Sequence, residues 1–226
     1  EGEGGGEGEG EGEGEGESWD IAWPEGDPTS CDVSGNAFSI ELATANFIAP
    51  PPDVASLLLD GIETQIAVLV EAQEAASMDL VVGVLDAGVQ DQCVETTELP
   101  GADWSDPVMS LGPTEVSILV QGFAVPLRDF RFAAAVTDDC GGVRDGAVIA
   151  QIDLRDLTDL LDEISPISDP ATLCLALPAL YGAECVACAD SEVTCLDFVA
   201  DSMAGTGGAA FQAISASDVA ANADCN

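Results

Sequence analysis

The chain has 226 residues, 43 of them acidic and only four basic, so its formal net charge at pH 7 is −39. All four basic residues are arginines, which excludes chemistry that depends on histidine or lysine: histidine-activated nucleophiles, imidazole metal ligands and Schiff bases. The charge also excludes nucleic acid as a partner, because binding to phosphates requires clustered Lys and Arg. The length favours a single domain.

The first 17 residues consist of Glu and Gly alone, with eight Glu and nine Gly. They offer no apolar side chain for burial and their carboxylates repel one another, so residues 1–17 are predicted to be a disordered, flexible tether. The remaining 209 residues still hold 35 acids and four arginines. Such an acidic, lysine-free surface predicts a halophilic protein from a saline habitat, where salt screens self-repulsion. The alternative is an acidic surface that serves only solubility in a secreted protein.

Residues 18–153 are predicted to be mainly β. Residues 38–47 begin with alternating apolar and polar side chains and are predicted to be a half-buried strand, which three prolines end. Asp53 is then expected to cap a short helix that ends at Gly61. Further strands are expected at 65–71, 80–85, 116–121, 130–136 and 147–153, where apolar or alternating runs occur. The hairpin-length connections favour an antiparallel sheet.

From residue 154 onward the apolar periodicity becomes helical. Leu154, Leu157 and Leu161 share one helical face, and the Asp169–Pro170 pair marks the start of a second helix. Residues 191–203 are interpreted as a third helix and 211–215 as a last short strand. The predicted fold class is therefore α+β, with a mainly antiparallel β-sheet (a sandwich or half-barrel) followed by a disulfide-stapled helical subdomain over 154–226 that packs on the sheet.

Eight cysteines, an even number, indicate disulfides formed in an oxidising compartment. A zinc site typically presents two Cys-x-x-Cys motifs and a redox pair lies at a helix start, so the single motif at Cys185 and Cys188 favours disulfides over metal or redox chemistry. Spacing does not fix the pairing; we expect Cys31–Cys225, Cys93–Cys140 and two bridges within 174–195. The cysteines assigned to disulfides are Cys31, Cys93, Cys140, Cys174, Cys185, Cys188, Cys195 and Cys225.

The acidic tail, the even cysteine count and the charge together resemble the mature part of uncharacterised acidic surface lipoproteins of marine myxobacteria-like Gram-negative bacteria. The resemblance rests on architecture and composition. It implies a lipid anchor upstream of residue 1, followed by the tether and a folded domain. No apolar run in the sequence is long enough to span a membrane. The expected location is extracellular or at the cell surface.

Candidate metal and catalytic sites depend on carboxylates. The loops 86–91 and 138–145 lack the spacing of a calcium-binding loop and are interpreted as solvated acidic turns. Neither the Asp-Thr-Gly nor the Asp-Ser-Gly tripeptide of aspartic proteases occurs, and with so many acids no pair can be nominated for glycoside hydrolysis. We therefore expect no enzyme activity, no cofactor and no metal site.

The arginines are expected to pair with nearby acids, for example Arg155 with Asp159 one helical turn later, and the alternative is an anion-binding site on adjacent strands. The preferred function is a non-catalytic binding module, because alternating strands and apolar helices could enclose an apolar pocket. Its ligand would be a lipid, a glycan or an envelope protein. The alternative function is a subunit that self-assembles into an extracellular filament or coat, and an acid-dependent hydrolase is a third hypothesis.

Overall fold

A computed structural model of the chain describes residues 19, 21–52, 55, 64–120, 123–164 and 167–225. The predicted tether of residues 1–17 lies outside these ranges. The helix predicted after Asp53 also lies outside them, apart from Ala55. All structural statements below concern the described residues.

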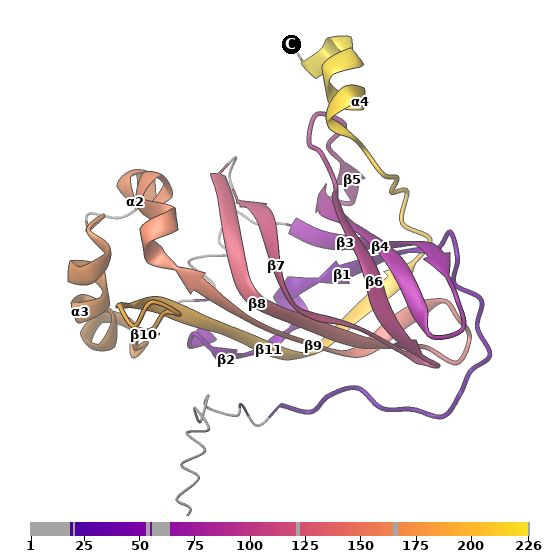
Figure 1. The fold of residues 1–226 in the computed structure, drawn as a ribbon, viewed down its shortest axis with the longest axis horizontal. Coiled ribbons are helices and arrows are strands. Elements are labelled where there is room, and N and C mark those ends of the chain that lie inside the picture. Colours follow the sequence, from indigo (N-terminus) through magenta and orange to yellow (C-terminus); the bar gives the residue numbers. More distant parts are fainter. Residues whose placement is uncertain are drawn as a thin grey trace, which may run out of the picture.

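Eight strands form a closed antiparallel barrel (Figure 1). Each strand pairs with the next strand along the barrel wall, and the first strand pairs with the last, at Phe38–Gly207 and Ile40–Gly205. The eight strands are β1 (Ala37–Glu41), β3 (Thr64–Gln73), β4 (Ser77–Asp86), β6 (Thr97–Ser105), β7 (Val108–Val120), β8 (Phe123–Val136), β9 (Gly142–Asp153) and β11 (Val193–Gly207).

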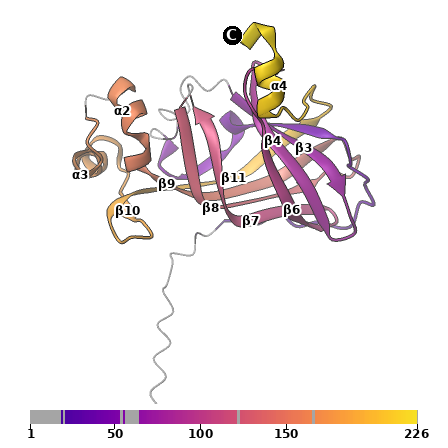
Figure 2. The same cartoon turned by 45° about the horizontal axis from the view of Figure 1, so that its top comes forward.

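Three short strands and several short helices lie beside the strands of the barrel wall. The three short strands are β2 (Asn46–Ala49) and β10 (Val186–Ala187), which pair with β11, and β5 (Val89–Gln90), which pairs with β4. The helical elements are η1 (Leu42–Thr44), η2 (Leu154–Leu157), α2 (Thr158–Ile164), α3 (Pro170–Tyr181), α4 (Ala216–Ala221) and η3 (Ala223–Cys225). Figure 2 shows α2 and α3 beyond the end of β9, well separated from α4.

The predicted α+β fold class is wrong in its architecture. The structure is a single closed barrel with a few short helices, and not a sandwich or half-barrel followed by a helical subdomain. The main cause is β11, because residues 191–203 were expected to be a helix, whereas Val193–Gly207 is a strand that closes the barrel. The predicted last strand at 211–215 is also absent from the sheet.

The barrel interior is filled by large apolar side chains over much of its length. Phe38, Met78, Leu80 and Met109 are all at most 2 % exposed and belong to one continuous core cluster with Trp104. The interior of an eight-stranded barrel is just wide enough to be filled by side chains or to hold one small ligand. The side chains of this cluster fill their part of the interior, so a ligand could bind only outside that part. A second cluster seats η2, α2 and α3 against β8, β9 and β11.

The barrel wall opens between β6 and β7. These strands pair only beside their connecting turn, from Asp103–Ser110 to Ser105–Val108. Beyond that point, residues 97–102 of β6 pair with β4, whereas residues 111–120 of β7 pair with β8. The two strands therefore diverge toward the end of the barrel at which β4 and β9 finish and η2 begins.

Residues 208–225, which we name the C-terminal strap, run from the end of β11 to this open part of the wall. Phe211 packs on the outer face of the barrel with Val81 and Leu85. Further along, Gln212 and Gln90 exchange two hydrogen bonds of 3.0 and 2.7 Å. The last cysteine of the strap, Cys225, forms a disulfide with Cys93. The strap is thus fixed to the barrel at several points along its length.

Candidate functional site

A pocket of about 610 Å³ lies where β6 and β7 separate. Ile66, Val82 and Val116 form its floor and pack against the main core of the barrel. Val94 and Ile214 add apolar surface from the segment before β6 and from the strap. The pocket is therefore an extension of the barrel interior that side chains leave unfilled. Its lining residues are Ile66, Val82, Gly83, Val94, Glu95, Thr96, Thr97, Glu98, Val116, Ser117, Ala213, Ile214, Ser215 and Asp218.

The strap forms one wall of this pocket. The Thr96 backbone N–H donates to the Ile214 carbonyl at 2.9 Å, and the Ile214 N–H donates to Thr96 Oγ1 at 2.9 Å. Ser215 then caps α4 through a capping box: the Ser215 hydroxyl oxygen accepts the Asp218 N–H at 3.3 Å, and the Asp218 carboxylate accepts the Ser215 N–H at 2.9 Å. These contacts place the first turn of α4 at the pocket rim and so determine the shape of the opening.

The polar groups of the pocket lie at its rim and are acidic or hydroxyl-bearing. Glu95, Glu98 and Asp218 are exposed, and no arginine is among the lining residues. Hydrogen bonds from Ser215 lower the pKa of the Asp218 carboxyl. Among the described residues, Glu95 and Glu98 have no side-chain hydrogen bond or ion pair. The rim is therefore negative at neutral pH, while the floor is apolar.

A cluster of charged side chains lies at the end of β9, around Asp153. This carboxylate is 1 % exposed, and its two oxygens accept hydrogen bonds from Nε and Nη2 of Arg155 at 2.6 to 3.1 Å. Arg155 also bonds Asp190 at 2.7 Å, and Arg128 Nη1 lies 3.6 Å from Asp153. Hydrogen bonds from Arg155 lower the pKa values of Asp153 and Asp190, and the pKa of Arg155 is raised by the same contacts.

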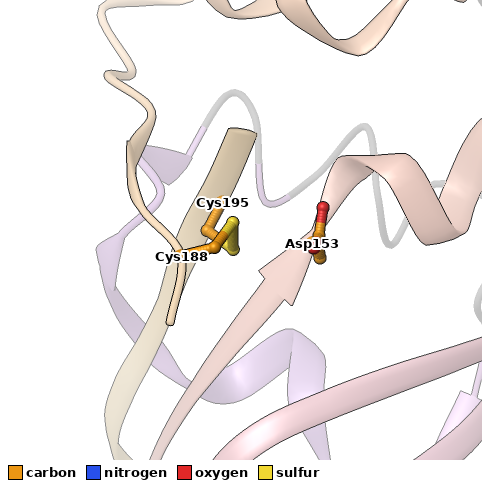
Figure 3. Close-up of side chains that lie close together, drawn as sticks. All are labelled: Asp153, Cys188 and Cys195. Carbon is orange, nitrogen blue, oxygen red and sulfur yellow. A yellow bond between two sulfur atoms is a disulfide. The ribbon is translucent and has the colours of Figure 1, made fainter. Parts of the chain in front are cut away.

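The Asp153 cluster is a structural ion-pair network. Cys188 and Cys195 lie close enough to Asp153 for all three to surround a metal, but their sulfur atoms are bonded to each other (Figure 3). A disulfide sulfur is not a thiolate, and the Asp153 oxygens are already occupied by Arg155, so these residues do not fit a metal ion. Asp153 also caps η2 through the Arg155 N–H. The network thus joins β8, β9, η2 and the β10–β11 turn.

Three of the four arginines pair with acids, as expected from the sequence, although the partner of Arg155 differs. Arg131 is exposed and forms no ion pair with any of the described residues. Arg155 binds Asp153 and Asp190 rather than Asp159, and Arg128 binds Asp156 at 2.6 Å. Arg144 pairs with Asp145. Because Asp153 and Asp156 flank Arg128, and Asp153 and Asp190 flank Arg155, the two neighbouring arginines leave no anion-binding site between them.

The acidic loops 86–91 and 138–145 are turns in which carboxylates accept hydrogen bonds from neighbouring residues, as predicted. Asp139 accepts from the Thr137 hydroxyl and the Gly141 N–H, and Asp91 accepts from the Cys93 N–H. Apart from the Asp153 trio, the described residues contain no group of three acidic or cysteine ligands close enough to share a metal ion.

All eight cysteines form disulfides, namely Cys31–Cys140, Cys93–Cys225, Cys174–Cys185 and Cys188–Cys195. The expected pair of bridges within 174–195 is present. The expected Cys31–Cys225 and Cys93–Cys140 bridges are wrong, because the strap returns to the segment before β6 and not to the N-terminal segment. Four disulfides fit a secreted or extracellular protein.

Models of known protein families, curated proteins and solved structures were all compared with the chain, and none of them matches it. Within the described ranges, no helix has both the length and the apolar character needed to cross a membrane. The class of protein is thus defined by fold and site alone: a disulfide-linked, closed eight-stranded barrel with a lateral pocket.

Proposed function

We propose that the protein is a secreted or cell-surface, non-catalytic module that binds one small amphiphilic molecule of the lipid class. The observation that supports this most directly is the gap between β6 and β7, which leaves about 610 Å³ beside the core. Ligand pockets of small molecules measure roughly 300–1,000 Å³ and are mostly apolar with a few polar groups.

The composition of the pocket supports binding rather than catalysis. Its floor of Ile66, Val82 and Val116 offers apolar contact, and its titratable lining residues are the exposed Glu95, Glu98 and Asp218. Hydrogen bonds from Ser215 lower the pKa of the Asp218 carboxyl, whereas the general acid of an acid-dependent hydrolase requires a raised pKa. The flexible tether expected at residues 1–17 would hold such a module away from the surface to which it is anchored.

The test is titration with Nile red, an uncharged dye whose fluorescence rises in apolar surroundings. Thr97 lies at the start of β6 and lines the pocket, so the indole of the Thr97→Trp variant should occupy part of the pocket and weaken binding of the dye. Ser105→Trp adds the same side chain at an exposed position of the same strand and is the matched control. Unchanged binding by Thr97→Trp, or equal loss in both variants, would contradict the proposal.

The alternative, a self-assembling subunit, is favoured by the exposed surface of α3. This helix carries no charged residue, and Leu175 and Leu180 are 84 % and 59 % exposed. Analytical ultracentrifugation in high salt separates the two functions. A concentration-dependent mass that is lost in a Leu175→Ser, Leu180→Ser variant, without any binding of Nile red, would favour assembly.

A further inference from the structure

We infer that the ligand of the pocket between β6 and β7 is an organic cation with an apolar body, such as an alkylammonium amphiphile. This inference rests on the proposed binding function and specifies its ligand class. It follows from three features of the pocket: its unpaired rim carboxylates, its apolar floor, and the absence of basic lining residues.

Glu95 and Glu98 combine two properties: their carboxylates are unpaired within the described ranges, and they line an apolar pocket. Several other acids are used internally, since Asp139 and Asp91 close turns and Asp153 and Asp190 bind Arg155. Other acids that are unpaired in the described part of the chain, such as Glu71 and Glu74, lie outside the pocket lining. Among the described residues, the side chains of Glu95 and Glu98 have no hydrogen bond and no ion pair. Two unpaired negative charges beside an apolar floor attract a positive group and disfavour an anionic one.

The spacing of the carboxylates favours an organic cation over a metal ion. The Asp153 trio is the one group of three ligand atoms within 4.8 Å of one another in the described part of the chain, and no pocket residue belongs to it. A calcium ion needs six to eight oxygen ligands at about 2.3–2.6 Å, which dispersed rim carboxylates do not supply. An alkylammonium group is bulkier and needs no such shell, and its chain could cover Ile66 and Val116.

The field of the whole protein acts in the same direction. The chain has a net charge of −39, and a cleft lined by one sign of charge with apolar walls concentrates that field. Salt weakens this contribution but leaves the apolar contact intact. The ligand's charge should therefore set selectivity at low salt, whereas its apolar part should set the affinity that survives at high salt.

The experiment is displacement of Nile red by three ligands with the same decyl chain: decyltrimethylammonium, decyl maltoside and decyl sulfate, each below its micelle-forming concentration. We expect decyltrimethylammonium to displace the dye at a concentration about tenfold or more below that of decyl sulfate in dilute buffer, with a smaller ratio in 1 M NaCl. Native mass spectrometry should show one cation per chain, and circular dichroism should show a folded protein.

The decisive variant pair is Glu95→Gln, Glu98→Gln against Glu71→Gln, Glu74→Gln. The second pair removes the same charge from exposed glutamates near the β3–β4 turn, outside the pocket lining. We expect the first pair to weaken cation binding by about threefold to tenfold and the second to change it much less. Equal effects of both pairs, or equal displacement by all three ligands, would overturn the inference while leaving the binding function standing. Failure of Nile red itself to bind would overturn the binding function.

Discussion

The ring of Phe211 lies so close to Gly83 that a Cβ on Gly83 would come within 2.8 Å of two ring carbons. Gly83 belongs to β4 and lines the pocket. Phe211 belongs to the C-terminal strap and packs on the barrel wall beside the pocket. The missing side chain of one residue thus makes room for the other, and this contact seats the strap on the barrel wall.

Replacing Gly83 with Ala should therefore displace Phe211 and lower the free energy of unfolding by about 1–3 kcal/mol, the usual cost of overpacking. Chemical denaturation with urea measures the change. A Gly83→Ala, Phe211→Leu double variant should recover part of the loss, because the smaller side chain relieves the contact. Additive effects of the two substitutions would show that the ring and Gly83 do not interact.

Asp153→Asn should lower the free energy of unfolding at pH 7 by about 2–4 kcal/mol, because it removes a buried carboxylate that accepts several hydrogen bonds from Arg155. The lowered pKa of Asp153 also fixes the sign of a pH effect. Its stabilising contribution is complete above the ordinary Asp pKa of ~3.9 and is lost as the pH falls through the lower folded value.

The measurement is urea denaturation of the wild type and Asp153→Asn at pH 7, 4 and 3. The difference between the two proteins should shrink toward the lowest pH, since protonation of Asp153 in the wild type mimics the substitution. Other acids with lowered pKa values, such as Asp139 and Asp106, contribute equally to both proteins and cancel. A constant difference across this range would contradict the assignment.

Removing the Cys93–Cys225 bridge should weaken Nile red binding more than removing Cys31–Cys140. The two bridges span similar loops, 132 and 109 residues, so each contributes at most about 5 kcal/mol in the chain-entropy view. The double-serine variants should thus lose similar stability. Of the two bridges, however, only Cys93–Cys225 holds the C-terminal strap, which forms one wall of the pocket. Binding is compared by dye titration at a temperature at which both variants are folded; equal loss of binding would argue against the strap as a wall.

Sodium chloride should raise the thermal midpoint by several degrees, because it screens the repulsion within a chain of net charge −39. The Debye length falls from ~10 Å at 0.1 M salt to ~3 Å at 1 M, so most of the increase should occur below about 1 M. Differential scanning calorimetry over this range is the measurement. A flat midpoint would contradict the prediction of a halophilic protein.

Much of the local structure could be predicted because single strands and helices carry their own patterns. Five of the predicted strands fall within β3, β4, β7, β8 and β9, apart from residue 121, which lies outside the described residues. The single strand predicted over 38–47 is instead divided by η1 into β1 and β2. The helix predicted from Asp169 and Pro170 is α3, which Asp169 caps and which ends at Gly182 in the left-handed conformation. The helical turn from Leu154 is also confirmed, as η2 and α2.

The errors arose where a strand has no alternating pattern. In β11, Ala200 faces the main core while its neighbour Val199 belongs to an outer cluster, so both faces of the strand are buried. A bulge between Ala200 and Met203 then breaks the period of two, and the apolar spacing of Leu196, Val199 and Met203 coincides with that of a helix. The strand β6 was missed because Pro100 and Gly101 interrupt its sequence.

The sequence could predict an apolar pocket, but it could not predict where the pocket lies. Apolar strands indicated that a pocket could form, but its position depends on where β6 and β7 stop pairing, and that is set by long-range register. Its walls come from residues as distant as Ile66 and Asp218. The pairing of Phe38 with Gly207 closes the barrel. It likewise could not be predicted, because nothing in the local sequence of either strand identifies the other strand as its partner.

The two long disulfides overlap along the chain, since Cys93 lies between Cys31 and Cys140, and Cys225 lies beyond them. A single peptide-bond cleavage anywhere from residue 31 to residue 225 therefore separates the two cysteines of at least one bridge. The fragments would remain covalently joined, and the nick would become visible on a gel only after reduction. A protease that makes one cut in an exposed turn would thus release no fragment of the barrel. Such tolerance of a single cut would be an advantage to a protein exposed to extracellular proteases.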